Sequence, residues 1–140
     1  MQQGVSEPKC KAILLCDKTI LEQGSNKISL IGVFQNFRLG TIPGLTREAE
    51  VFCQITDAEG EYELRVEIHD LDGGEIIARA EGQPIEIPHR LMRANIIIPF
   101  PQIPIPHAGK YDFVLLANNC EIDRQTFTVS EIKGGEDGSR

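Results

Sequence analysis

Residues 104–129 read PIPHAGKYDFVLLANNCEIDRQTFTV, and this segment carries the strongest fold signal in the chain. Two prolines stiffen a corner, a strand begins at Gly109, the pair Asn118-Asn119 makes a tight turn, and a second strand returns. A glycine, one further residue and then a tyrosine just inside a strand is the local pattern of the tyrosine corner in Greek-key sandwiches. The segment therefore predicts a corner followed by a β-hairpin.

The corner pattern makes a specific prediction for Tyr111. We expect its ring to be buried and its hydroxyl to bond to the backbone of the preceding connection. Because side chains alternate along a strand, Phe113 and Leu115 should share its core face.

The connection before this corner, residues 83–107, is rich in proline. Proline lacks the N–H that a strand ladder needs, so it is found at sheet edges and in crossovers. We expect strand pairing only around residues 95–98, and we interpret the rest as a bridge between two sheets. The prolines are Pro84, Pro88, Pro99, Pro101, Pro104 and Pro106.

Two strand candidates precede the middle of the chain. Residues 9–17 have apolar side chains at both parities, which is typical of a strand covered on both faces. Residues 27–39, KISLIGVFQNFRL, form the longest strand candidate and are interrupted by Gly32. A glycine inside a strand marks a bulge or a close approach by another backbone.

The middle of the chain predicts a meander of three antiparallel strands, residues 49–57, 61–70 and 75–82, joined by short turns. The second of these alternates most regularly, with one face on the core and the other in water. Its core face holds Tyr62, Leu64, Val66 and Ile68, and its solvent face includes Glu61, Glu63, Glu67 and His69. The meander would supply one sheet, and the C-terminal hairpin with part of the first two strands would supply the other.

Seven or eight short strands separated by turn residues predict an all-β fold, an antiparallel β-sandwich with an immunoglobulin-like Greek key. A partly open β-barrel is the alternative. We expect a single domain over residues 9–132, with flexible termini at residues 1–8 and 133–140.

Composition narrows the class of partner. The 140 residues carry a formal net charge of −7, which disfavours binding to the phosphate backbones of nucleic acids. No apolar run reaches the roughly 18 residues of a membrane-spanning helix, and no signal-peptide pattern opens the chain. The sequence thus predicts a cytoplasmic protein with no membrane span.

The four cysteines contain no C-x-x-C pair, so they do not predict a zinc site. Cys10 and Cys16 could share one face of a strand, but six residues of strand span about 20 Å, too far for a disulfide. We interpret Cys10, Cys16, Cys53 and Cys120 as reduced thiols that serve as small apolar side chains.

The motif D-x-D-G-G at residues 70–74 is the only acidic cluster with ligand-like spacing. Asp70 and Asp72 could both face a calcium ion from one loop, as in C2-type calcium and lipid modules. The same motif is equally a hairpin turn, and it lacks the later bidentate glutamate of an EF-hand.

No other motif points to catalysis. The three histidines, His69, His89 and His107, have no metal-ligand spacing, so we expect surface positions for them. Neither a nucleophile-elbow motif nor a glycine-rich phosphate loop is present, so we predict no catalytic residue and no cofactor.

Three stretches resemble a family of small bacterial proteins known only as a domain of unknown function. They are AILLCD at residues 12–17, NKISLIGVF at residues 26–34 and AGKYDF at residues 108–113. The family has an L-C-D ending before a K-x-S-L-I-G-V/I-F/Y strand, and a closing G-x-Y-x-F/L strand. The resemblance extends to about Val129 and implies a bacterial, standalone β-sandwich, but it assigns no activity, cofactor or catalytic residue.

These observations favour a non-enzymatic binding or scaffold module that acts through protein–protein contacts, with itself or a neighbouring gene product as the partner. A C2-like sandwich that binds calcium or anionic lipid at Asp70 and Asp72 is one alternative. An enzyme whose site is assembled in space from distant residues is the other.

Overall fold

The computed structural model describes residues 7–132, and the regular structure in that range is all β. Eight of its thirteen strands have six residues or more, which agrees with the seven or eight strands expected. The strands are β1 (Lys9–Leu21), β2 (Ile28–Val33), β3 (Asn36–Leu39), β4 (Gly44–Leu45), β5 (Ala49–Thr56), β6 (Gly60–Tyr62), β7 (Leu64–Asp70), β8 (Ile76–Glu81), β9 (Ile85–Ile87), β10 (Ala94–Phe100), β11 (Pro104–Ile105), β12 (Gly109–Ala117) and β13 (Cys120–Glu131).

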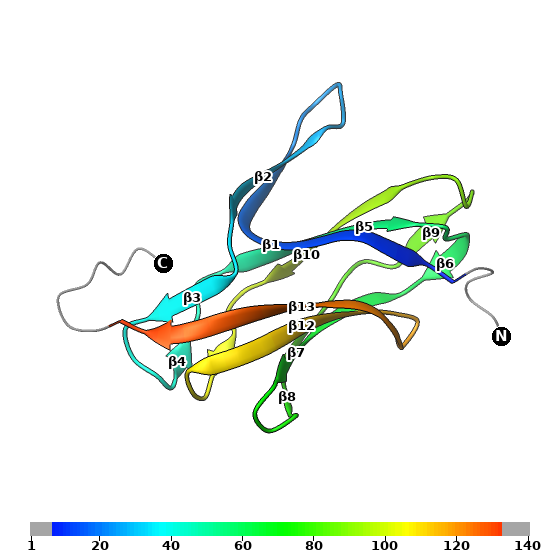
Figure 1. Cartoon of the computed structure of the whole chain (residues 1–140). Helices are drawn as coiled ribbons and strands as arrows, with labels where there is room; N and C mark the ends of the chain where they lie inside the picture. Colours follow the sequence, from blue (N-terminus) through cyan, green and yellow to red (C-terminus); the bar gives the residue numbers. More distant parts are fainter. Residues whose placement is uncertain (1–6, 133–140) are drawn as a thin grey trace.

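Two sheets form the body of the domain (Figure 1). One has the strand order β10-β5-β1-β2, and the other has the order β3-β13-β12-β7-β8. The pairs β4·β11 and β6·β9 form two small additional sheets. The described strands thus make four separate sheets and not one closed barrel.

The core lies between the two main sheets and follows from alternation along their central strands. In β5, Val51 and Cys53 are fully buried, and in the opposite sheet so are Val66 of β7 and Leu115 of β12. The predicted core face of residues 61–70 is confirmed. Its four members, Tyr62, Leu64, Val66 and Ile68, are at most 3% exposed.

The tyrosine corner is confirmed. Tyr111 is fully buried, and its hydroxyl donates to the carbonyl oxygen of His107 at 2.5 Å. Phe113 and Leu115 are buried beside it, and the Tyr111 ring stacks on Phe127 of the neighbouring strand β13 with the ring centroids 5.6 Å apart. The proline-rich connection therefore ends where its backbone is tied to the core.

The predicted meander is only partly confirmed: β7 and β8 pair antiparallel as expected, but β5 does not join them. β5 pairs with β1 and β10 in the first sheet, whereas β7 pairs with β12 and β8 in the second. The link between them contains Asp57 and Gly60, both with positive φ, and the buried Ala58. The chain therefore crosses the core edge there, because turn residues permit an arch between sheets as readily as a hairpin within one.

The C-terminal hairpin is expected to share its sheet with part of the first two strands, and the structure confirms this only for residues 36–39, where β3 pairs with β13. β1 and β2 belong to the sheet of β5, and the hairpin β12–β13 belongs to the sheet of β7. Pairing partners far apart in sequence are set by how the whole core closes, which alternation along a single strand does not specify.

The strand expected over residues 27–39 is split between the sheets. The Phe34 N–H still donates to Leu15 in the first sheet, while the Gln35 carbonyl already accepts from Thr128 in the second. After this switch, β3 runs parallel to β13, the one exception to antiparallel pairing among the described strands.

Gly32, before the switch, has φ of 69°, and a Cβ there would lie 2.2 Å from Asp17 Oδ2. A close approach is thus present, but by a side chain and not by a backbone.

The proline-rich connection crosses between the sheets as expected, but the expectation that only residues around 95–98 pair is wrong. Pairing also occurs at β9, which pairs with β6, and at β11, which pairs with β4. β10 is an edge strand that pairs with β5, including Pro99 opposite Glu50. Residues 101–108 then carry the chain from the first sheet to β12 in the second.

Of the expected flexible termini, residues 1–8 and 133–140, all but residues 7 and 8 lie outside the described residues. Residues 7–132 contain no helix that could span a membrane.

Candidate functional site

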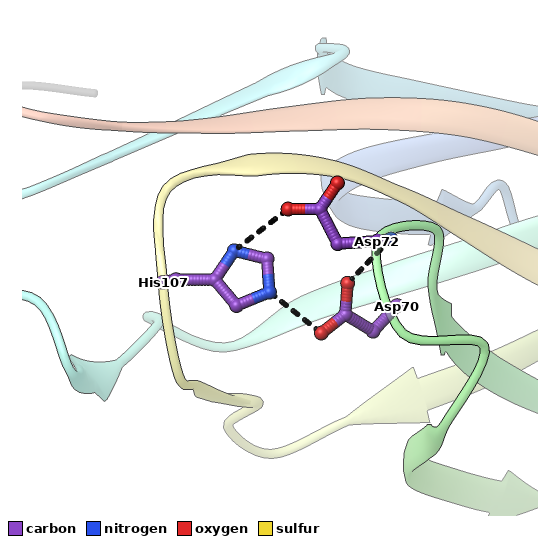
Figure 2. A group of neighbouring side chains, drawn as sticks. All are labelled: Asp70, Asp72 and His107. Carbon is purple, nitrogen blue, oxygen red and sulfur yellow. Dashed lines mark hydrogen bonds and ion pairs between the residues drawn. The ribbon is translucent and has the colours of Figure 1, made fainter.

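Two aspartates and a histidine meet at one end of the second sheet (Figure 2). Asp70 ends β7, Asp72 lies in the turn to β8, and His107 lies in the connection that leads to β12. One ligand atom from each of the three side chains lies within 4.8 Å of the others. We call Asp70, Asp72 and His107 the carboxylate–histidine cluster.

The two aspartates of this cluster lie in a hairpin turn between β7 and β8. The hairpin turn is one of the two interpretations that the D-x-D-G-G motif allows. The Asp72 N–H donates to Asp70 Oδ1 at 2.9 Å, and the Gly74 N–H donates to the Asp70 carbonyl oxygen at 2.7 Å. Gly74 has φ of 77°, a conformation that glycine adopts without a steric cost. The local motif alone therefore fixes how the two aspartates lie relative to each other.

The second side is His107, whose ring uses both nitrogens. Nε2 lies 2.6 Å from Asp70 Oδ2, and Nδ1 lies 2.8 Å from the Ala108 carbonyl oxygen. A carbonyl oxygen can only accept, so Nδ1 carries a hydrogen. The hydrogen bond to Ala108 and the one to Asp70 together raise the pKa of His107. The ring is therefore stabilised as an imidazolium ion next to the carboxylate.

Asp70 is the buried member, with its side chain 5% exposed. Burial raises the pKa of this carboxyl group, but the hydrogen bonds from the Asp72 N–H and from His107 outweigh it, and the net pKa is lowered. Asp72 is 80% exposed, with its Oδ2 3.8 Å from His107 Nδ1. The cluster thus combines one fixed carboxylate with one that solvent can reach.

Sequence spacing selects Asp70 and Asp72 but misses His107, which lies 37 residues after Asp70. The tyrosine corner is the signal that could have found it, because the Tyr111 hydroxyl anchors the His107 carbonyl oxygen. The His107 ring also stacks on the Tyr111 ring, with centroids 5.5 Å apart. The corner thus positions the third side chain.

The other two histidines lie elsewhere. His69 Nε2 is 2.9 Å from Glu67 Oε1, and His89 accepts a hydrogen bond from the Leu91 N–H in an exposed turn. Glu67 is only 6% exposed, because Arg65 and His69 lie across it. The expectation that Glu67 faces water is therefore wrong.

The cysteines do not gather into a site. Cys16 and Cys53 are buried, Cys10 is half-buried and Cys120 is exposed, and all four are free thiols. Burial, followed by the charge of Asp123, raises the pKa of Cys10 to about 11. Burial also raises the pKa values of Cys16 and Cys53. These three thiols are therefore poor nucleophiles at neutral pH.

A second feature, which the sequence interpretation missed, is a projecting hairpin. Residues 18–33, here called the hairpin arm, extend away from the two-sheet body (Figure 1). β1 leaves β5 after the pair Cys16 and Glu50, and beyond that point it pairs only with β2. The arm exposes Ile20 (45%), Leu21 (60%), Ile31 (48%) and Val33 (47%).

A hydrogen-bonded contact fixes the base of the arm. Glu50 Oε1 accepts from the Thr19 N–H at 2.7 Å and from the Thr19 hydroxyl at 2.8 Å. Arg47 donates to Asp17 at 2.7 Å and lies over the Phe34 ring at 4.5 Å. The arm therefore leaves the body from a well-anchored base.

Structure comparison supports the fold. An alkylpurine DNA glycosylase, AlkC from Pseudomonas fluorescens, solved with DNA containing an abasic site analog, matches 89% of this chain with a TM-score of 0.55 and 9% identity. A β-glucosidase from Listeria innocua in complex with glucose matches 91% of the chain with a TM-score of 0.51 and 10% identity. The match covers 31% of the glycosylase and 16% of the β-glucosidase, so this chain corresponds to a minor part of each. At these identities the likeness concerns the fold alone.

Sequence comparison identifies the family. No curated protein matches the chain significantly. A family model described as a family of unknown function, DUF6941, matches residues 11–130. This range contains the three resembling stretches, the carboxylate–histidine cluster and the hairpin arm. The chain therefore belongs to DUF6941, a family of unknown function.

Proposed function

We propose that the chain is a non-enzymatic protein-binding module that associates by strand addition at β2, and that its partner is a second copy of the chain. The observation that carries this proposal is the composition of β2, Ile28–Val33, as an edge strand. Its sequence, ISLIGV, contains neither a charge nor a proline.

The other edges of the two main sheets are protected against pairing. β10 contains Pro99, β8 contains Arg79 and Glu81, and β3 is four residues long and contains Arg38. Short length, charge and proline are the devices by which proteins keep edge strands from adding to one another. Among these four edges, β2 alone is a strand of six residues without such a device.

A second copy fits this edge for an electrostatic reason. In a two-fold pairing, each residue of β2 meets a residue of the same strand in the other copy. A charged strand would then place like charges opposite each other, which is destabilising. Ile28–Val33 brings no charge to such a pairing, although the whole chain carries −7. Exposed Ile31 and Val33 would lose water contact in the same interface.

Two observations favour binding over catalysis. Three of the four thiols have raised pKa values, and both nitrogens of His107 are engaged in hydrogen bonds. The free thiols are compatible with the reducing cytoplasm that the sequence predicts.

Light scattering after size-exclusion chromatography of the full chain at roughly 100 µM tests the proposal. We expect the mass of a dimer for the natural sequence and for Leu91→Lys, whose parent side chain is 82% exposed but lies outside the arm. Ile31→Lys should give a monomer, because it brings one lysine from each copy into the same short strand pairing. A monomeric natural chain, or a dimer that survives Ile31→Lys, contradicts the proposal.

A further inference from the structure

The carboxylate–histidine cluster brings together two types of metal ligand from two separate parts of the chain. We propose that Asp70, Asp72 and His107 bind one divalent transition-metal ion, with zinc as the representative, and that water completes its coordination. This site is independent of the β2 edge, which lies in the other sheet.

The hydrogen bonding of His107 supports this proposal. A histidine that binds a metal through one nitrogen usually donates from the other to a carboxylate or a backbone carbonyl, which fixes the tautomer and the ring orientation. Nδ1 of His107 already donates to the Ala108 carbonyl oxygen at 2.8 Å, and Nε2 points at Asp70 Oδ2. The supporting contact of a metal-ligating imidazole is thus in place.

The ligand spacing requires only a local adjustment. Zinc binds nitrogen and oxygen ligands at about 2.1 Å in a tetrahedral arrangement, so two ligands of one ion lie about 3.4 Å apart. The three ligand atoms here lie within 4.8 Å of one another. Asp72 Oδ2 lies 3.8 Å from His107 Nδ1, so Asp72, which is 80% exposed in a turn, must change its rotamer to reach an ion at Nε2.

One contact must also open. His107 Nε2 and Asp70 Oδ2 are hydrogen-bonded at 2.6 Å, and a metal ion would take the place of the proton between them. The step is an exchange in which the ion binds both atoms and the proton leaves to solvent. Metal binding should therefore release about one proton and weaken as the pH falls.

The donor set favours zinc over calcium. Calcium takes six to eight oxygen ligands, whereas an imidazole nitrogen with carboxylates suits zinc and related transition metals. The two carboxylates also balance the charge of a divalent ion. With His107 added, the cluster therefore suits zinc better than the calcium ion that Asp70 and Asp72 suggest in the sequence.

Isothermal titration calorimetry of the untagged full chain with zinc chloride tests this inference. We expect one ion per chain, and proton release seen as a heat that changes with the ionisation enthalpy of the buffer. Asp72→Asn and His107→Gln should each weaken binding by at least about tenfold, with circular dichroism to verify that the variants fold.

Matched controls separate this site from other zinc ligands. His89→Gln and Cys120→Ser, each at an exposed position outside the cluster, should leave the affinity unchanged. No binding of zinc, equal affinity after His107→Gln, a loss in Cys120→Ser or calcium binding as tight as zinc binding would each overturn the inference.

Discussion

The Tyr111 hydroxyl donates a hydrogen bond of 2.5 Å to the carbonyl oxygen of His107, and the two rings stack with centroids 5.5 Å apart. Tyr111 lies in the core, whereas the side chain of His107 reaches Asp70 at the end of the sheet. His107 thus links the tyrosine corner, through its carbonyl oxygen, to the carboxylate–histidine cluster, through its ring.

Removing this hydroxyl should affect both stability and the cluster. We expect Tyr111→Phe to lower the free energy of unfolding by about 1–2 kcal/mol, because the His107 carbonyl loses its partner. It should also weaken zinc binding. Urea unfolding and calorimetry measure the two effects.

Tyr62→Phe is the matched control. Tyr62 is also buried, and its hydroxyl bonds to the Glu59 backbone at 3.0 Å, far from the cluster in the β6–β9 sheet. Tyr62→Phe should lower the free energy of unfolding by a similar amount without changing the affinity for zinc. Equal losses of zinc affinity in both variants would contradict the role given to Tyr111.

The His107–Asp70 pair should make stability depend on pH. The raised pKa of His107 means that its contribution is complete below the ordinary value of 6.5 and is lost as the pH rises through the folded-state pKa. The lowered pKa of Asp70 means that its contribution is complete above 3.8 and is lost as the pH falls through the folded-state pKa. The pair is thus most effective between pH 3.8 and 6.5.

Urea unfolding of the metal-free chain and of His107→Gln across pH measures this effect. The stability difference between them should be largest in that window and should shrink toward pH 8. If the stability difference between the two proteins is the same at every pH, the ion pair between His107 and Asp70 is not its cause.

Gly32 should tolerate no side chain. An added Cβ would lie 2.2 Å from Asp17 Oδ2, and φ of 69° is unfavourable for alanine. We expect Gly32→Ala to lower the free energy of unfolding by about 1–3 kcal/mol. Gly40→Ala, where no atom lies within 4 Å of the added Cβ, should change it by less than about 0.5 kcal/mol. Similar unfolding curves for both variants would contradict this account.

Glu50 should hold the base of the hairpin arm. Glu50→Ala removes the acceptor of two hydrogen bonds from Thr19, so the arm should open locally more often. With a cost of about 1 kcal/mol for these partly exposed bonds, amides around Thr19 should exchange about fivefold faster. Glu48→Ala, at an exposed position two residues earlier, serves as the control and should leave exchange unchanged. Hydrogen exchange measured on monomeric Ile31→Lys avoids protection from self-association.

Local patterns in the sequence predict much of the fold. Tyr62, Leu64, Val66 and Ile68 form a core face because side chains two residues apart in a strand point to the same side of the sheet. The glycine–tyrosine spacing gives the corner, and the prolines give an edge strand and a crossover. The D-x-D-G-G turn likewise depends only on contacts between residues close in sequence.

Long-range pairing lies beyond such patterns. The turn at residues 57–60 has the same residue types as a hairpin, yet it carries the chain from β5 to the opposite sheet. The apolar residues of β2 suggest a covered strand, but the arm projects from the body and leaves Ile31 and Val33 exposed. Periodicity states which side chains are apolar and not which surface covers them.

The sequence by itself thus determined the all-β class, the corner at Tyr111 and the turn that holds Asp70 and Asp72, because short-range geometry and alternation fix these features. Only the tertiary structure decided that His107 joins the two aspartates and that β2 is an unprotected edge. Both depend on which strands close the core together, and that choice is made by the packing of side chains distant in sequence.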